Sequence, residues 1–324
     1  MIRRLLASAP STVAVEIAPR RVAAAVVALR GGRLAVTAHA SEPLAPGLVT
    51  PALNAANVRD AGELARAVAR AFERLGEHPR RVALAIPDSA AKVSLMQFEK
   101  VPPRAADFDE LVRWQMRKSA PFKMDEAQVS CLPGLPRTAG AHEFVVVVAR
   151  RDILREYEAA IEAAGAQAGL VDLTTFNVIN TVLAAPAPPS GDWLLVHVTS
   201  DYATIAIIRD QSLVFFRNRS NESEGSLADL VHQTAMYYED RLKGAGFARA
   251  LLAGAGLLAG DLASGPETAE RIRHTLEERL HTKVDAVDPR GVAGLTEPVA
   301  AGPDLLDTLA PLVGLIARQH ERAA

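Results

Sequence analysis

Several features that would place the chain outside ordinary globular proteins are scarce in its sequence. Cysteine occurs once among 324 residues, as Cys131, so the chain cannot form an internal disulfide or a paired-thiol metal or redox site. Neither sign of charge is in excess, since 36 Lys and Arg residues nearly balance 38 Asp and Glu residues. This balance excludes a general nucleic-acid-binding charge field. No stretch of the sequence approaches the roughly 18 uncharged apolar residues of a membrane-spanning helix.

What is present is the composition of a folded protein. Hydrophobic residues make up 49% of the chain and charged residues 23%, which excludes intrinsic disorder. The length suggests about two domains. The segment from Met1 to Ala9 has the basic start of a secretory signal, but its apolar stretch is too short. Because a single cysteine also fits a reducing compartment, we expect the protein in the cytoplasm.

The opening of the chain predicts three sequential antiparallel strands. Residues 12–17, 22–29 and 34–38 are rich in β-branched residues and are separated by short turn segments. After the Pro-rich segment 184–190, the same pattern returns. Strands are expected there at residues 193–198, 203–208 and 213–217.

The two openings can be aligned residue by residue, which indicates an internal duplication. The matching pairs are Glu16 with His197, Ala18 with Thr199, Val26 with Ile207 and, after a two-residue slip, Leu34 with Leu213. We therefore expect a first lobe over residues 1–184 and a second over residues 185–324. Each lobe is expected to be a mixed sheet flanked by helices.

An insertion over about residues 88–148 is expected in the first lobe. Its pattern is strand, helix, strand, strand, with the strands at residues 92–98, 128–132 and 144–149. The helix between them has an apolar face formed by Leu111, Val112 and Met116. Trp114 lies two residues beyond Val112, so on a helix its side chain points away from that face.

Several short segments, in this order and spacing, resemble the PilM family of type IV pilus assembly proteins within the actin-like ATPase superfamily. The segments include Leu84-Ala-Ile-Pro-Asp-Ser89, Phe98-Glu-Lys-Val-Pro-Pro103, Val146-Val-Val-Ala-Arg-Arg151, Met236-Tyr-Tyr-Glu239 and Leu251-Leu-Ala-Gly254. The resemblance implies an α/β fold of the duplicated actin-like (ribonuclease H-like) type. It also implies two lobes around a cleft and a strand-helix-strand-strand subdomain inserted in the first lobe.

In this superfamily, ATP lies between two hairpin turns that usually read Asp-x-Gly followed by Ser or Thr. The first turn here is Glu16-Ile-Ala18-Pro19, which keeps a carboxylate but loses glycine and, at Pro19, a backbone donor. The second turn is His197-Val-Thr199-Ser200, without the aspartate and glycine. A neutral imidazole is a poor holder of hydrated magnesium. We therefore expect no cofactor, or ATP bound only weakly, near Glu16, Thr199 and Ser200.

Three further positions resemble nucleotide-site residues of the superfamily. Gly254-Ala-Gly256 resembles the Gly-rich adenosine motif, although a plain structural turn is as well supported. Asp172 could face the cleft, although a helix N-cap is the favoured interpretation. His274 and His281 are expected on the surface, and no metal site is predicted.

The resemblance implies a binding partner, the cytosolic amino-terminal tail of a PilN-like inner-membrane protein. We expect this tail in a groove between the first lobe and the insertion, with Trp114, Met116 and Phe122 as candidate contacts. The predicted function is a scaffold of a type IV pilus or related secretion machine, held by its partner at the inner face of the inner membrane. Efficient ATP hydrolysis and nucleic-acid binding are not expected, and self-association stays open.

Two alternatives are kept. An active actin-like ATPase or small-molecule kinase would need both phosphate turns intact. An FtsA-like division protein would be expected to carry a long basic, amphipathic carboxyl-terminal tail, which does not follow Arg322 in this sequence.

Overall fold

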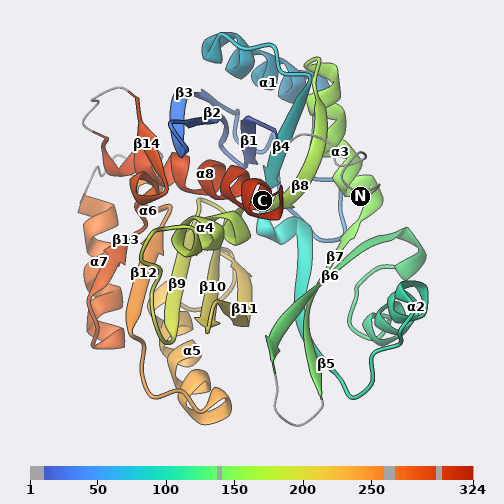
Figure 1. The fold of residues 1–324 in the computed structure, drawn as a ribbon, viewed down its shortest axis with the longest axis vertical. Coiled ribbons are helices and arrows are strands. Elements are labelled where there is room, and N and C mark those ends of the chain that lie inside the picture. Colours follow the sequence, from blue (N-terminus) through green and yellow to red (C-terminus); the bar gives the residue numbers. More distant parts are fainter. Residues whose placement is uncertain (1–10, 137–140, 259–266, 297–300, 324) are drawn as a thin grey trace.

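The computed structural model describes residues 11–136, 141–258, 267–296 and 301–323, so the segment from Met1 to Ala9 lies outside the description. Three sheets organise the described residues (Figure 1). In the view of Figure 1, the first sheet lies at the top, the second at the lower left and the sheet of the inserted subdomain at the lower right.

The first sheet has helices on both faces. Its strands, in spatial order, are β14 (Ala293–Leu295), β3 (Arg33–Pro43), β2 (Arg21–Arg30), β1 (Val13–Ala18), β4 (Arg81–Ile86) and β8 (Gln167–Leu173). Alternate residues of β1 face opposite sides, so Val13 and Val15 share a core with α1 (Ala61–Leu75) and α3 (Arg151–Ala163), whereas Ala14 faces the last helix of the chain.

Local sequence fixes the ends of α1. The Asp60 side chain accepts a hydrogen bond of 2.8 Å from the Glu63 amide at the first turn. Gly76 ends the helix in the left-handed conformation, with φ of 68°.

The second sheet repeats the strand order of the first. Its strands are β11 (Ser212–Ser220), β10 (Tyr202–Arg209), β9 (Trp193–Val198), β12 (Arg249–Ala253) and β13 (Val284–Ala286). Helices α5 (Leu227–Leu242), α6 (Ala255–Leu258) and α7 (Glu267–Leu280) belong to this half. The order β3-β2-β1-β4-β8 corresponds to β11-β10-β9-β12-β13.

The predicted register of the duplication is confirmed by the strand pairing as far as Val26 and Ile207. Glu16 pairs with Ala23, and His197 pairs with Thr204, each in an antiparallel ladder. The β2–β3 ladder shifts just after Val26, and the β10–β11 ladder shifts just after Ile207. These are the two positions that the sequence alignment matched, so both openings carry a bulge at the same place.

Beyond this bulge, the predicted two-residue slip, which matched Leu34 with Leu213, is wrong. Val27 pairs with Val36 as Ile208 pairs with Leu213, so Val36 is the equivalent of Leu213 and the slip is four residues. In the first opening the hairpin tip is longer, running to residue 30, and it turns through Gly31 and Gly32. In the second it ends at residue 209 and turns through Asp210 and Gln211, which also have positive φ. Turns with two positive φ values match the twist of paired strands.

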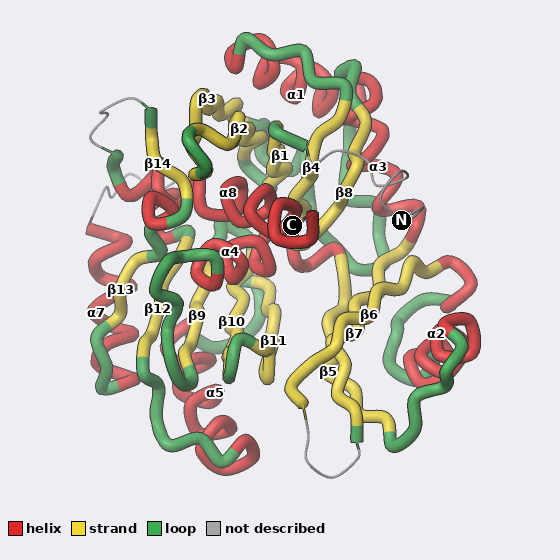
Figure 2. Tube along the Cα trace, in the orientation of Figure 1, coloured by secondary structure: helices red, strands yellow, loops and turns green. Residues whose placement is uncertain are grey.

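The inserted subdomain has the expected strand, helix, strand, strand order. It consists of β5 (Ala91–Phe98), α2 (Ala105–Met116), β6 (Ala127–Pro136) and β7 (His142–Arg150), with β7 in the middle of the sheet. Val146 and Val148 of β7 share a core with Val112 and Met116 of α2. The subdomain leaves the first lobe at β5 and returns through β7 (Figure 2).

Two helices at the centre join the halves. These are α4 (Thr174–Leu183) and α8 (Pro303–Ala323). Phe176 of α4 packs edge-on against Phe216 of β11, with ring centroids 5.3 Å apart, so α4 contacts the second sheet. The α8 helix packs on small residues of the first sheet, among them Ala14, Ala23 and Ala83.

The end of the chain returns to the first lobe. The β14 strand pairs with β3, and α8 covers one face of the first sheet. Both elements follow residue 185 and were expected in the second lobe. The division at residues 184 and 185 stays a prediction for the rest of the chain, but it does not describe these two elements.

Candidate functional site

The two hairpin turns that the sequence matched face one cavity of about 130 Å³. Glu16 and Pro19 line it from the first lobe, and His197, Thr199 and Ser200 line it from the second. The cavity is smaller than the roughly 300–1,000 Å³ of ordinary small-molecule sites.

In the first turn, the retained carboxylate already has a cationic partner. Glu16 is buried, and Arg21 Nη2 donates to its Oε2 at 2.6 Å. Pro19, between them in sequence, has no amide hydrogen to offer a phosphate. The guanidinium therefore occupies the place beside the carboxylate that a hydrated cation would need.

In the second turn, His197 is buried in the neutral form. Burial lowers its pKa to about 3. Its Nδ1 lies 2.7 Å from the Thr175 hydroxyl of α4. Because the single hydrogen of that hydroxyl goes to Asp88, the imidazole is the donor to Thr175. The ring is therefore fixed by Thr175, and it offers no carboxylate to a hydrated magnesium ion.

The other residues of the second turn bond to one another. The Thr199 hydroxyl accepts from the amide of Tyr202 at 3.1 Å and of Asp201 at 3.3 Å. The exposed Ser200 hydroxyl donates to the Asp201 carboxylate. The expected phosphate-facing groups are thus part of a local turn.

The Gly-rich turn after β12 is occupied by a carboxylate from α8. The amides of Gly254 and Gly256 donate to Asp307 at 2.8 and 2.7 Å. Desolvation raises the pKa of Asp307 to about 6. A side chain on Gly254 would lie 2.0 Å from the Val198 carbonyl oxygen. The structural interpretation of these glycines, which the sequence left open, therefore accounts for both of them.

Asp172 takes neither of the positions that the sequence suggested. The helix α4 has Leu173 at its N-cap and no side-chain cap, and Asp172 does not line the cavity between the two turns. Instead its carboxylate forms an ion pair with Arg318 of α8. The cap interpretation is wrong because Asp172 is one residue too early in β8.

Sequence reasoning missed Asp88, the centre of a buried polar network between the lobes. Its carboxylate accepts from the Thr175 amide at 3.0 Å and the Thr204 hydroxyl at 2.7 Å. Burial raises its pKa to about 6. The nearby Ser89 hydroxyl donates to Asn218 of β11 at 2.8 Å. The available signal was a charged residue directly after the buried strand β4, in Pro87-Asp88-Ser89.

A larger groove separates the first lobe from the inserted subdomain. Its volume is about 400 Å³. Edge strand β8 contributes residues 168–173, and edge strand β6 of the other sheet contributes Gln128, Ser130 and Leu132. The charged residues that line it are the Asp172–Arg318 ion pair and Glu158.

The three predicted partner contacts do not line this groove. Residues 128, 130 and 132 face it, whereas Val129 and Cys131 face α2 on the opposite side of the sheet. Trp114 is 58% exposed on the outer side of α2, as its spacing predicted. Met116 is 1% exposed in the subdomain core, so its assignment as a partner contact is wrong. Phe122 is half-buried beside that core.

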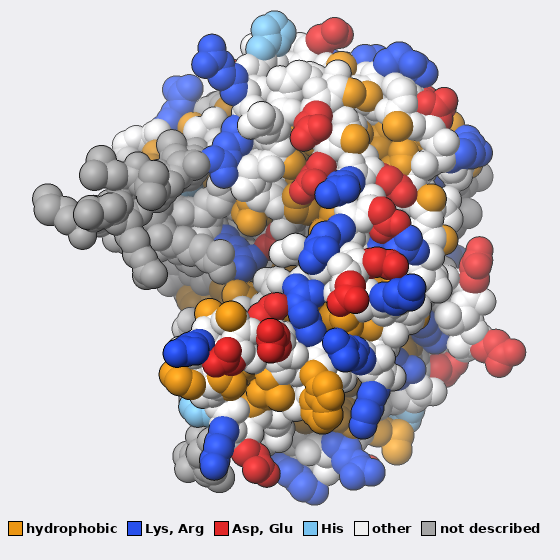
Figure 3. Space-filling model, turned by 90° about the vertical axis from the view of Figure 1, so that its right-hand side faces the viewer, with side chains coloured by type: hydrophobic (Ala, Val, Ile, Leu, Met, Phe, Trp, Pro, Cys, Tyr) orange, Lys and Arg blue, Asp and Glu red, His pale blue; other side chains and the backbone are white. Residues whose placement is uncertain are grey.

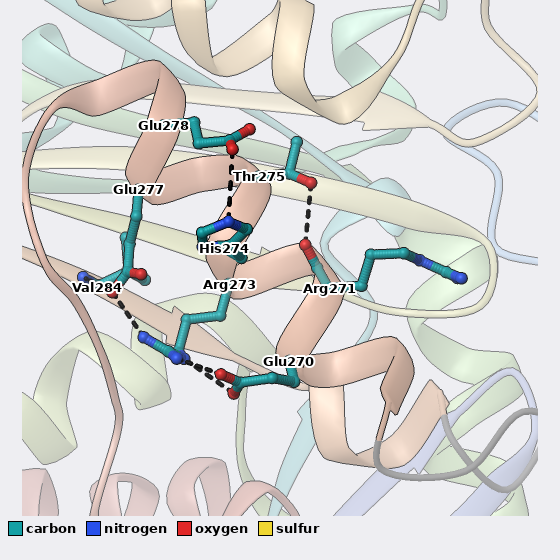
Figure 4. Close-up of polar contacts among 8 residues, drawn as sticks. All are labelled: Glu270, Arg271, Arg273, His274, Thr275, Glu277, Glu278 and Val284. Carbon is teal, nitrogen blue, oxygen red and sulfur yellow. Dashed lines mark hydrogen bonds and ion pairs between the residues drawn. The ribbon is translucent and has the colours of Figure 1, made fainter.

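The expected surface histidines are confirmed on α7 and directly after it. His274 lies 3.3 Å from Glu278 in an exposed pair, beside Arg273, which bridges Glu270 and Glu277 (Figure 4). His281 is exposed at the helix end. Across the described ranges, no three His, Cys, Asp or Glu side chains are grouped to hold a metal ion.

No helix in the described parts of the chain is long and apolar enough to span a membrane.

Known proteins are similar to this chain in fold and, over a long stretch, in sequence. A chain in the structure of a PilM–PilN type IV pilus biogenesis complex superposes with a TM-score of 0.78 at 16% identity, over 95% of this chain and 98% of that one. The cytoplasmic domain of EpsL, an inner-membrane component of the type II secretion system of Vibrio cholerae, gives 0.45 at 13% identity, over 74% and 80%. A comparison with curated protein sequences finds no match.

The family model of the type IV pilus assembly protein PilM matches residues 14–241. This range runs from β1 to α5 and includes both hairpin turns and the whole inserted subdomain. It covers more than half of the chain. The chain therefore belongs to the PilM family of type IV pilus assembly proteins.

Proposed function

We propose that this PilM-family chain binds the cytosolic amino-terminal tail of a PilN-like inner-membrane protein and does not hydrolyse ATP efficiently. The partner would hold the chain at the inner face of the inner membrane. Membership of the family and the fold shared with a chain of a PilM–PilN complex support this proposal.

The groove between β8 and β6 is the observation that carries the proposal. Two edge strands from different sheets border it, and each edge has backbone groups that an extended peptide can bond. Val147, Leu154 and Leu170 give it apolar walls. An extended tail would place alternate side chains against these walls and its polar groups near the Asp172–Arg318 pair.

The contacts around the cavity support the second half of the proposal. Magnesium-bound phosphates would have to displace Arg21 from Glu16 and enter a space of about 130 Å³. The turn amides that would serve adenosine are bonded to Asp307. Each displacement costs the chain hydrogen bonds of its own.

Titration of the full chain with a synthetic PilN-like tail peptide tests the binding site. Ser130→Arg puts a long cation into the groove from an exposed position on β6, so we expect at least tenfold weaker peptide binding, a loss of about 1.4 kcal/mol. The matched control is Asp107→Arg, which adds the same side chain to α2 on the other face of the sheet. Unchanged affinity in Ser130→Arg, or an equal loss in both variants, would contradict the proposed groove.

A further inference from the structure

The carboxyl-terminal end of α2 presents an aromatic side chain among cations. Trp114 is exposed over 58% of its surface, and the Lys118 ammonium lies 5.9 Å from its ring centroid. Arg117, Lys118 and Lys123 are all exposed, and none of them forms an ion pair with the described residues. Of the acidic residues of α2, Asp107 lies in the first turn, and Glu110 lies one turn before Trp114.

The loop after α2 adds apolar surface to these cations. Arg117, Phe122 and Lys123 line a hollow of about 460 Å³, together with Pro121 and one carboxylate, Asp125. Figure 3 shows the side of the molecule that carries the inserted subdomain, with blue side chains around an orange group in its lower half. Cations beside apolar walls match a ligand that is anionic at one end and hydrocarbon at the other.

The second exposed aromatic residue, Tyr237, has different charged residues around it. Tyr237 on α5 is 45% exposed and packs beside Phe215, with ring centroids 5.4 Å apart. Its neighbours Glu239 and Asp240 are exposed acids. Trp114 has cations three and four residues onward, where Tyr237 has Asp240 and Arg241. Only the end of α2 therefore combines an exposed aromatic with a run of unpaired cations among the described exposed aromatics.

We propose that the end of α2, defined by Trp114, Arg117, Lys118, Phe122 and Lys123, contacts an anionic lipid surface. Tryptophan suits the boundary between headgroups and acyl chains, because its ring is apolar and its N–H can bond to headgroups. Lys and Arg side chains within a Debye length of anionic lipid are attracted to it. The surface lies on the opposite face of the inserted sheet from the tail groove, so both contacts can form at once.

Tryptophan fluorescence of the full chain reports this contact directly. The chain has two tryptophans, and Trp193 is 1% exposed inside the second lobe, so only Trp114 can respond to a surface. The probes are vesicles of phosphatidylcholine with one third phosphatidylglycerol, and vesicles of phosphatidylcholine alone. We expect a blue shift and co-flotation with the anionic vesicles, weaker at high salt, and neither effect with the neutral ones.

Variants separate this surface from the tail groove. Replacing Arg117, Lys118 and Lys123 by Gln should weaken vesicle binding on the order of 100-fold, about fivefold per cation. Trp114→Ala should also weaken it, and Tyr237→Ala should leave it unchanged. Tail-peptide affinity in solution should be unaffected by the Trp114 and cation changes. Absent vesicle binding, binding equal in all variants, or a loss of tail-peptide affinity in Trp114→Ala would overturn the proposal, the last by making this a protein-binding surface.

Discussion

The first and second hairpin openings have the same backbone and different chemistry. Their ladders pair in the same register and carry a bulge at matching positions. At the β1–β2 turn of the first opening, Glu16 forms an ion pair with Arg21. At the equivalent β9–β10 turn of the second, His197 bonds to Thr175. Strand register depends on alternating burial along many residues, whereas a site depends on a few side chains. The duplication can therefore persist while the nucleotide chemistry differs.

A carboxylate also bonds to backbone amides in each half, but in one half it lies after a strand and in the other it lies on a helix. Asp88 follows β4 and accepts from the amide of Thr175 in α4. Asp307 lies on α8 and accepts from the amides of Gly254 and Gly256 after β12. In each case a carboxylate of the chain accepts hydrogen bonds from backbone amides of another element.

The largest expected effect on stability comes from a substitution that forces α4 and α8 apart. Gly314 of α8 is so close to α4 that a Cβ would lie 1.9 Å from the Asn177 carbonyl oxygen. Gly314→Ala should lower the free energy of unfolding by about 3 kcal/mol or more, because backbone must move. The control is Gly294→Ala, where a Cβ meets nothing within 4 Å. Equal unfolding midpoints in urea for the two variants would show that the halves are not joined through this contact.

A smaller loss of stability is expected from removing the Asp307 carboxylate, which bonds to the turn after β12. Asp307→Ala leaves the Gly254 and Gly256 amides without their acceptor, which should cost about 1–3 kcal/mol. Urea unfolding measures the loss. Asp304→Ala, at an exposed position one turn earlier on α8, is the matched control. A variant as stable as the wild type would mean that Asp307 is not needed to satisfy the turn.

The pH dependence of stability should differ in sign between the two halves. The pKa of Asp88 is raised from 3.8 to about 6. Its contribution to the free energy of unfolding is therefore full below about pH 4 and is lost as the pH rises through 6. The pKa of His197 is lowered from 6.5 to about 3. Its contribution to the free energy of unfolding is therefore present above pH 6.5 and is lost as the pH falls. Between pH 4 and 6, Asp88→Asn should make acidification more destabilising and His197→Gln should make it less so. Shifts in the same direction for both variants, in unfolding curves at each pH, would refute this assignment.

The sequence predicted the features that depend on residues close together in the chain, namely the strands, the turns and the faces of the helices. Alternating β-branched residues and turn segments predicted the two openings and their register as far as the bulge, and helical spacing placed Trp114 outward. The same spacing put Met116 on the apolar face, which is where it is buried, so naming it as a partner contact was inconsistent with its own helix.

The contacts that define the site join residues distant in sequence. Asp307 is 53 residues from Gly254, and Arg318 is 146 residues from Asp172. The pairing of β14 with β3 joins residues from the two ends of the chain. Such contacts depend on how α8 crosses to the first sheet, which periodicity within a segment does not specify.

Calorimetric titration of the full chain with ATP, with and without magnesium, tests the central claim most directly. The ion pair at Glu16, the buried His197 and the Asp307 contacts predict no magnesium-dependent binding and no turnover. Magnesium-dependent binding in the micromolar range, together with turnover that Glu16→Ala abolishes, would contradict the account.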